Sequence, residues 1–180
     1  MPSATDKFTG DLCSLIRDVP DFPKPGILFR DVTPLLQNGP AFRACIERLC
    51  ENLASVRPSV IAGIESRGFI FGAAAAAIMG IGFVPVRKFG KLPWKTRQAR
   101  YQLEYGGDGI EVHEDAVTKG ARVALVDDLL ATGGTAGAAR RLLEEVGGQV
   151  VVASFVVELA ALKGRDKLPG LPIQALITYG

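Results

Sequence analysis

The amino-acid sequence predicts an α/β fold with a doubly wound, mainly parallel β-sheet. Apolar runs of the length of buried strands alternate with segments in which apolar residues recur at helical spacing. One of these runs ends in Asp127 and Asp128, and a loop with two glycines and then a helix follow it, as at the carboxyl edge of a parallel sheet. The chain has 180 residues and shows no internal repeat or linker, so we expect one domain over residues 1–180.

The first half of the chain already alternates as this fold class requires. In order, the predicted elements are a short helix at 6–17, an ordered and extended proline-rich loop at 19–31, a helix at 40–56, a buried strand at 60–64, a helix at 69–79 and a strand at 82–86. The helix at 40–56 is predicted because five apolar residues fall on one of its faces. They are Phe42, Cys45, Ile46, Leu49 and Leu53.

The second half begins with a predicted β-hairpin arm that leaves the main sheet. Alternating residues at 101–105 and 110–113 flank the turn signal Gly-Gly-Asp-Gly at 106–109. The elements after the arm are a strand at 122–126, a helix at 134–146 that two glycines end, and strands at 150–157 and 173–177. Strands that alternate with helices favour parallel pairing.

The composition narrows the class of protein and its location. The chain is 48% hydrophobic and 22% charged with a net charge of +2, which is ordinary for a globular enzyme. Three cysteines without a CxxC pair and a single histidine argue against a structural zinc site, and we expect no protein-held metal site. The odd cysteine count and an N-terminus without an apolar core favour the cytoplasm.

One uncharged stretch, residues 68–86, has the length of a membrane span. However, Gly72, Gly80, Gly82 and Pro85 interrupt it, and a run of alanines adds little hydrophobicity. We therefore predict a buried helix followed by a buried strand, and no membrane partner.

The segment VALVDDLLATGGTA, residues 123–136, carries the strongest functional signal. Its apolar strand ends in Asp127 and Asp128, and its loop ends in Thr-Gly-Gly-Thr where a helix begins. The N-terminus of a helix offers free backbone N–H groups to an anion, and glycines let the backbone approach a phosphate closely. Paired carboxylates instead suit a neutral polyol or a developing positive charge. Together these features describe a site for a sugar phosphate.

A simpler interpretation is a helix N-cap with incidental acidic residues, because Thr132 or Thr135 alone would cap a helix well. This interpretation accounts for one threonine but not for two adjacent carboxylates after a buried strand. The patterns GxxxxGK[ST] and GxGxxG are both absent, so a Walker loop and a dinucleotide fingerprint are not indicated.

A second group of cations follows the strand at 82–86. Its members, which have no acidic residue between them, are Arg87, Lys88, Lys91, Lys95, Arg97 and Arg100. Arg67, which follows the strand at 60–64, extends the group. We predict a second anion site here, and the alternative is a solvated basic face or a nucleic-acid patch.

The segment at 123–136 resembles the phosphoribosyl-pyrophosphate-binding motif of type I phosphoribosyltransferases. The resemblance implies the type I phosphoribosyltransferase fold, with an N-terminal hood at about residues 1–35 and a flexible β-hairpin arm at about residues 95–115. It implies that Asp127 and Asp128 are catalytic, because they face the ribose hydroxyls and stabilise an oxocarbenium-like transition state. The residues implied to cradle the ribose 5-phosphate are Ala131, Thr132, Gly133, Gly134 and Thr135.

The segment Glu-Ser-Arg-Gly at 65–68 resembles the pyrophosphate loop of the same family. The resemblance implies that four cations bind the pyrophosphate, namely Arg67, Arg87, Lys88 and Lys91. Because this loop often contains a non-proline cis peptide in the family, we predict such a bond between Glu65 and Ser66.

Two further segments resemble those of adenine phosphoribosyltransferases. PDFPKPGILFRD, residues 20–31, is similar to the adenine-binding hood, which implies that Phe29 stacks on the purine while the backbones of Leu28 and Arg30 contact its edge. The alternative is a loop that uses Phe22 and Phe29 as core residues.

YQLEYG, residues 101–106, is similar to the flexible catalytic loop of this subfamily. The resemblance implies that Glu104 acts as acid or base on a purine ring nitrogen, and the alternative is an exposed hairpin glutamate. The chain departs from the subfamily at Trp94 and Lys95, just before this segment.

The resemblance implies the reaction of adenine with phosphoribosyl pyrophosphate to give AMP and pyrophosphate, a step of purine salvage. It also implies Mg²⁺ held mainly by substrate oxygens and water. It further implies a homodimer in which the partner supplies part of the second group of cations, such as Lys88. Two alternatives remain: the same fold acting on another purine base, or a phosphoribosyl-pyrophosphate-sensing regulator that binds nucleic acid. No added nucleic-acid-binding module is visible, so we expect no nucleic-acid partner.

Overall fold

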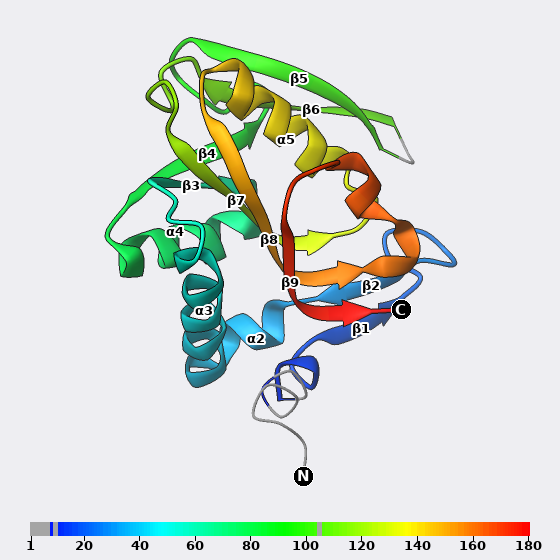
Figure 1. Cartoon of the computed structure of the whole chain (residues 1–180). Helices are drawn as coiled ribbons and strands as arrows, with labels where there is room; N and C mark the ends of the chain where they lie inside the picture. Colours follow the sequence, from blue (N-terminus) through cyan, green and yellow to red (C-terminus); the bar gives the residue numbers. More distant parts are fainter. Residues whose placement is uncertain (1–7, 9–10, 104–105) are drawn as a thin grey trace. The chain divides into compact units, whose positions relative to one another are not determined.

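The computed structural model describes Phe8, residues 11–103 and residues 106–180. The chain divides into two compact units, Met1–Arg48 and Leu49–Gly180. Figure 1 shows the course of the chain through both units. The predicted helix at 6–17 lies partly outside the described residues, and its described helical part ends at Cys13.

The first unit contains a small antiparallel sheet. Its strands are β1 (Arg17–Pro20) and β2 (Leu28–Asp31), and Val19 pairs with Phe29. The prediction of an extended loop over 19–31 was therefore wrong at both of its ends. Prolines are tolerated at the end of a strand and in a turn, so the same composition accommodates two short strands. The Asp21 carboxylate accepts a hydrogen bond from Gly26 N at 2.6 Å and closes the connection between them.

Two helices follow β2. Helix α2 (Thr33–Gln37), which the sequence did not predict, has a proline in its first turn, where the missing N–H costs nothing. Helix α3 (Gly39–Ala54) matches the prediction and crosses the boundary between the units. Four of the five residues expected on its apolar face are fully buried, and Phe42 is half-buried.

The second unit is built on a sheet with the strand order β5-β6-β4-β3-β7-β8-β9 in its described residues. Strands β3, β4, β7, β8 and β9 pair in parallel, whereas β5 and β6 form an antiparallel hairpin at the β4 edge. The bounds are β3 Val60–Ile64, β4 Gly82–Lys88, β5 Thr96–Leu103, β6 Gly106–His113, β7 Arg122–Leu130, β8 Gln149–Leu159 and β9 Ile173–Tyr179. The predicted mainly parallel sheet is confirmed.

Helices α4 (Arg67–Met79) and α5 (Gly134–Glu145) cover opposite faces of this sheet. Ile61 on β3 faces α4, because its side chain lies next to Gly72. The next residue, Ala62, packs in the core cluster that contains Leu142 and Leu143 of α5. Since consecutive strand residues point to opposite faces, one helix lies on each face, as a doubly wound sheet requires.

The hairpin β5–β6, here called the arm, differs from the prediction in the position of its turn. Leu103 pairs with Gly106, so the glycine-rich stretch expected to form the turn belongs to β6. A glycine is required at Gly109, because a Cβ at this position would lie 2.0 Å from an atom of the Phe89 ring. The glycine allows the ring to pack on the strand, and Figure 1 shows the arm extending beside α5.

The uncharged stretch at 68–86 forms most of α4 and the first part of β4, as predicted. Within the described part of the chain, the helices are too short or too polar to cross a membrane.

Candidate active site

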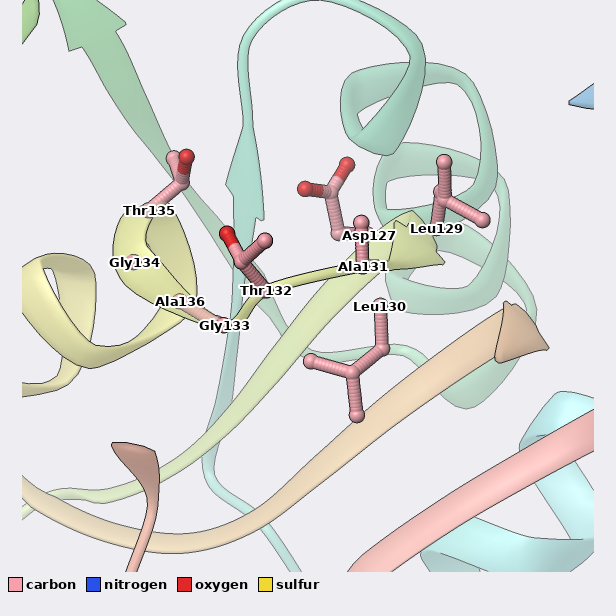
Figure 2. A pocket seen from close by; sticks show the side chains of 9 residues that line it. All are labelled: Asp127, Leu129, Leu130, Ala131, Thr132, Gly133, Gly134, Thr135 and Ala136. Carbon is pink, nitrogen blue, oxygen red and sulfur yellow. The ribbon is translucent and has the colours of Figure 1, made fainter. Parts of the chain in front are cut away.

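The loop between β7 and α5 lies at the carboxyl edge of the parallel sheet. It begins where β7 ends at Leu130, and α5 begins at Gly134. The loop residues and the Asp127 side chain line a cavity of about 130 Å³. Figure 2 shows the Asp127 carboxylate and the hydroxyls of Thr132 and Thr135 pointing to the same side of the loop. All five residues predicted for the phosphate, 131–135, line this cavity.

The N-terminus of α5 has no side-chain cap. Its N-cap residue is Gly133, in the left-handed region at φ 77°, and glycine has no side chain that could accept a hydrogen bond from the first turn. The alternative that Thr132 or Thr135 serves as a helix cap is therefore not realised. The first-turn residues 134–136 line the cavity, and the free N–H groups and positive dipole end of a helix N-terminus suit an anion.

A short 3₁₀ segment, η2 (Gly164–Lys167), packs directly against the loop. A Cβ at Gly133 would lie 2.2 Å from Gly164 O, and a Cβ at Gly164 would lie 2.3 Å from Ala131 O. Arg165 of η2 donates two hydrogen bonds of 2.6 Å to the buried carboxylate of Glu158 on β8 and so links the two elements. The loop conformation is thus held by close backbone contacts that tolerate no side chain.

The two adjacent carboxylates at the end of β7 have different partners. Asp128 is buried, and its Oδ2 accepts a hydrogen bond from Nε of Arg67. Asp127 Oδ1 accepts a hydrogen bond of 2.9 Å from Asp128 N, and it lies close to Gly68, where a Cβ would be 2.6 Å away. The structure therefore brings Arg67, predicted for the pyrophosphate, against Asp128, predicted for the ribose.

Burial raises the pKa of Asp127 well above its usual range, and the negative charge of Asp128 adds to the rise. The positive charge of Arg67 opposes it only in part. A cation that approached this edge would lower the energy of the ionised form of Asp127. The acid pair is thus suited to developing positive charge.

The segment predicted as the pyrophosphate loop, residues 65–68, spans the connection between β3 and α4 and the start of α4. The peptide bond between Glu65 and Ser66 is cis, which confirms the prediction. The Glu65 carboxylate accepts hydrogen bonds from Arg87 Nε at 3.2 Å and from Lys88 N at 2.9 Å. Burial alone would raise the pKa of Glu65, but the Lys88 N–H and the Arg87 guanidinium outweigh it and lower the pKa.

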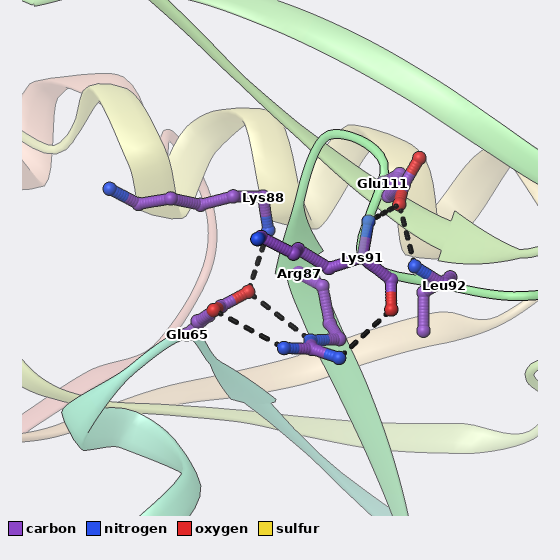
Figure 3. Close-up of polar contacts among 6 residues, drawn as sticks. All are labelled: Glu65, Arg87, Lys88, Lys91, Leu92 and Glu111. Atoms are coloured by element: carbon purple, nitrogen blue, oxygen red, sulfur yellow. Dashed lines mark hydrogen bonds and ion pairs between the residues drawn. The ribbon is translucent and has the colours of Figure 1, made fainter.

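Figure 3 shows how these contacts join three of the predicted cations, here called the basic cluster, which are Arg87, Lys88 and Lys91. Arg87 Nη1 donates to the carbonyl of Lys91 at 2.9 Å, and the backbone N–H of Lys91 donates to Oε1 of Glu111 at 2.9 Å. Glu65 was predicted only as part of the pyrophosphate loop, and Glu111 was not predicted as a site residue. The partners of Glu111 lie more than ten positions away and include two backbone N–H groups, so no local pattern in the sequence identifies it.

The first unit holds the residues predicted for the purine. Phe29 on β2 is half-buried, and its ring meets that of Phe22 edge to face at 5.2 Å. Phe22 is 51% exposed and Leu28 is 45% exposed, so Phe22 does not serve as a core residue. The Arg30 guanidinium pairs with the carboxylate of Asp18 on β1. The backbone of Arg30 belongs to β2, where it lies opposite Asp18.

Glu104, predicted as the acid or base, lies outside the described residues. The described part of the arm near it is basic, as the sequence indicates, and Arg97 pairs with Glu114 at 3.2 Å. Trp94, where the chain departs from the subfamily, is 63% exposed.

Comparison with known proteins identifies the family. The model of the phosphoribosyl transferase domain matches residues 33–169. The curated adenine phosphoribosyltransferase of a Synechococcus species is 53% identical over 169 residues, which cover 94% of this chain and 99% of that protein. That of Thermotoga maritima is 52% identical over 172 residues, covering 96% and 99%.

Solved structures agree with the sequence relatives. The crystal structure of adenine phosphoribosyltransferase from Thermoanaerobacter pseudethanolicus has a TM-score of 0.93 at 50% identity and covers 95% of this chain and 99% of its own. That of the Saccharomyces cerevisiae enzyme, complexed with an imino-altritol bisphosphate and adenine, has a TM-score of 0.88 at 41% identity and covers 94% and 98%. The chain therefore belongs to the phosphoribosyltransferase family, within its group of adenine phosphoribosyltransferases.

Proposed function

We propose that the edge formed by β3, β4 and β7 binds phosphoribosyl pyrophosphate and transfers its phosphoribosyl group to adenine, which gives AMP and pyrophosphate in purine salvage. The observation that carries this proposal is the uncapped N-terminus of α5, which shares one cavity with the carboxylate of Asp127. Such a site offers donors to a phosphate and negative charge to the sugar beside it.

The 5-phosphate binds to the loop at 131–135. Backbone N–H groups at the start of α5 and the hydroxyls of Thr132 and Thr135 supply the donors, and the left-handed Gly133 sets the curvature of the loop. These groups fix the sugar with its anomeric carbon towards the end of β7. Positioning of this kind removes most of the entropic part of the barrier.

Asp127 and Asp128 act on the ribose. As the bond between the anomeric carbon and the pyrophosphate oxygen breaks, positive charge develops on the ring, and the two carboxylates stabilise it. Asp128 is held by Arg67 before substrate binds. When the Arg67 guanidinium turns to the pyrophosphate, the charge of Asp128 becomes available to the sugar.

Arg67, Arg87, Lys88 and Lys91 bind the pyrophosphate and stabilise it as a leaving group. Glu65 holds two of them, because it accepts hydrogen bonds from the Arg87 side chain and the Lys88 backbone. A carboxylate among cations also reduces their mutual repulsion before the anion arrives.

Adenine binds to the hood, where Phe29 stacks on the ring and the backbones of Leu28 and Arg30 contact its edge. The structure of the Saccharomyces cerevisiae relative, which is complexed with adenine, supports the choice of base. A ring nitrogen of adenine donates its electron pair to the anomeric carbon, the pyrophosphate leaves with the electrons of the broken bond, and Glu104 takes up the proton that the ring loses.

The reaction would require Mg²⁺, which substrate oxygens and water would mainly hold. The acid pair fits a nearby cation, since the pKa of Asp127 is raised by burial and by the charge of Asp128. The ion supplies charge neutralisation for the pyrophosphate.

We also propose that the chain forms a homodimer through α4. Arg67 is the only charged residue of this helix, and Ile70 and Ile78 are 42% and 59% exposed on its outer side. A second copy of the chain would cover this apolar face, and the partner would then contribute cations such as Lys88. The cysteines are free, which fits the reducing cytoplasm.

The test is a panel of purine bases assayed with phosphoribosyl pyrophosphate and Mg²⁺. We expect AMP and pyrophosphate in equal amounts from adenine, and kcat/KM values for hypoxanthine and xanthine lower by about 100-fold or more. Turnover of the oxopurines alone would assign the site to another base. Binding of DNA or RNA without turnover of any base would instead favour the regulator.

A further inference from the structure

We propose that Glu111 is a positioning residue for pyrophosphate binding, because it holds the segment that carries Lys91 in place. The inference rests on the proposed function of the basic cluster. It concerns a side chain that would contact neither substrate and that lies on β6 of the arm.

The Glu111 side chain is buried and accepts four hydrogen bonds. Its Oε1 receives the backbone N–H groups of Lys91 at 2.9 Å and Leu92 at 3.0 Å. Its Oε2 receives the Thr96 hydroxyl at 3.3 Å and the Gln98 amide at 3.1 Å. The residue is only 2% exposed. A buried carboxylate is tolerated where hydrogen bonds satisfy both of its oxygens, as they do here.

Burial alone would raise the pKa of Glu111, but the Leu92 N–H, the Gln98 amide and the other donors outweigh it, and the pKa is lowered. Glu111 therefore remains ionised at neutral pH. Its hydrogen bonds are charge-assisted and stronger than those of a neutral acceptor.

The contacts form one continuous chain through the basic cluster, as Figure 3 shows. Glu65 binds the Arg87 guanidinium, Arg87 binds the carbonyl of Lys91, and the N–H of Lys91 binds Glu111. The backbone of Lys91 is thus held on both sides, by Arg87 at its carbonyl and by Glu111 at its N–H. Without Glu111, the backbone N–H groups of Lys91 and Leu92 would lose their acceptor, and the segment would be free to shift.

Glu111 also connects this segment to the arm. Thr96 and Gln98, the other two donors, lie on β5, which precedes the predicted catalytic loop. One carboxylate therefore sets the base of the arm and the position of Lys91 together. Loss of Glu111 should weaken binding of the pyrophosphate portion of the substrate much more than binding of adenine.

The deciding variant is Glu111→Gln, which keeps the side-chain volume and one carbonyl acceptor but removes the charge. Steady-state kinetics should show KM for phosphoribosyl pyrophosphate raised by about fivefold, with KM for adenine within about twofold of the wild type. Glu111→Ala, which removes all four bonds, should raise the same KM by about 50-fold. Glu114→Gln is the matched control, because it removes the exposed carboxylate that pairs with Arg97 on the same hairpin, and it should leave both constants unchanged.

A double-mutant cycle separates positioning from a general loss of stability. In a Lys91→Ala background, Glu111→Gln should raise KM for phosphoribosyl pyrophosphate by less than about twofold, since the side chain it positions is gone. Equal effects of Glu111→Gln on both KM values, or full additivity with Lys91→Ala, would overturn the inference. Absence of adenine turnover in the wild type would instead refute the proposed function itself.

Discussion

Gly133→Ala tests whether the shape of the β7–α5 loop determines binding of phosphoribosyl pyrophosphate. Gly133 has φ 77°, and a Cβ added there would lie 2.2 Å from Gly164 O. Real Cβ atoms do not approach backbone closer than 3.0 Å, so the two segments must separate by about 0.8 Å. Gly164 cannot retreat easily, because it already packs against Ala131 O and the Leu130 side chain.

The magnitude follows from these two effects. A left-handed backbone costs an L-residue about 1–2 kcal/mol, and the forced contact adds about 1–2 kcal/mol more. The free energy of unfolding should therefore fall by about 2–4 kcal/mol, measured by urea denaturation. A displacement approaching 1 Å at the phosphate donors should lower kcat/KM for phosphoribosyl pyrophosphate by about 100-fold, measured by steady-state kinetics.

Gly170→Ala is the matched control for backbone strain. Gly170 has φ 70°, but a Cβ there would meet no atom within 4 Å. This variant should lose about 1–2 kcal/mol of stability and keep its kinetic constants. The reasoning is refuted if Gly133→Ala shows the same KM and kcat as Gly170→Ala.

The remaining predictions concern the acid pair, the arm and the dimer. Asp128→Asn should lower kcat by about 100- to 1,000-fold in the steady-state assay, and unchanged kinetics would exclude the electrostatic role of Asp128. Its Tm should change little, because the partner Arg67 is 39% exposed and can be hydrated instead. Since the pKa of Asp127 is raised in the folded chain, that state binds protons more readily than the unfolded chain, and stability falls as pH rises above the usual carboxyl range. Asp127→Asn should therefore stabilise the chain at pH 7 more than at pH 4 in denaturation experiments, and an equal shift at both would contradict the pKa argument. Glu104→Gln should lower kcat without weakening phosphoribosyl pyrophosphate binding, measured by calorimetry, and full activity would exclude it as the acid or base. Ile78→Asp should convert the proposed homodimer to a monomer in analytical ultracentrifugation, and an intact dimer would place the interface elsewhere.

The parts of the site that could be predicted from the sequence are those formed by consecutive residues of the chain. The strand, the paired Asp127 and Asp128, the glycine loop and the helix follow one another, so their order along the chain already determines their order in space. The elements of the parallel sheet were predictable for the same reason, because each strand carries its own apolar run.

The supports of the site could not be predicted in this way. Glu111 binds backbone groups about twenty residues away, and any residue type except proline would offer the same N–H. Gly164 packs against the phosphate loop from a segment with no distinctive pattern of its own. The turn of the arm was misplaced because the close packing of Phe89 on Gly109, and not a tight turn, requires a glycine there.

The most direct test of the account is an NMR titration of the ¹⁵N-labelled chain with ribose 5-phosphate. The account predicts that the largest amide shifts fall at residues 131–135, where the loop after β7 meets the start of α5, and that Gly133→Ala abolishes them. Shifts confined to the basic cluster around Arg87 and Lys91, with the loop amides unchanged, would contradict the assignment of this loop to the 5-phosphate.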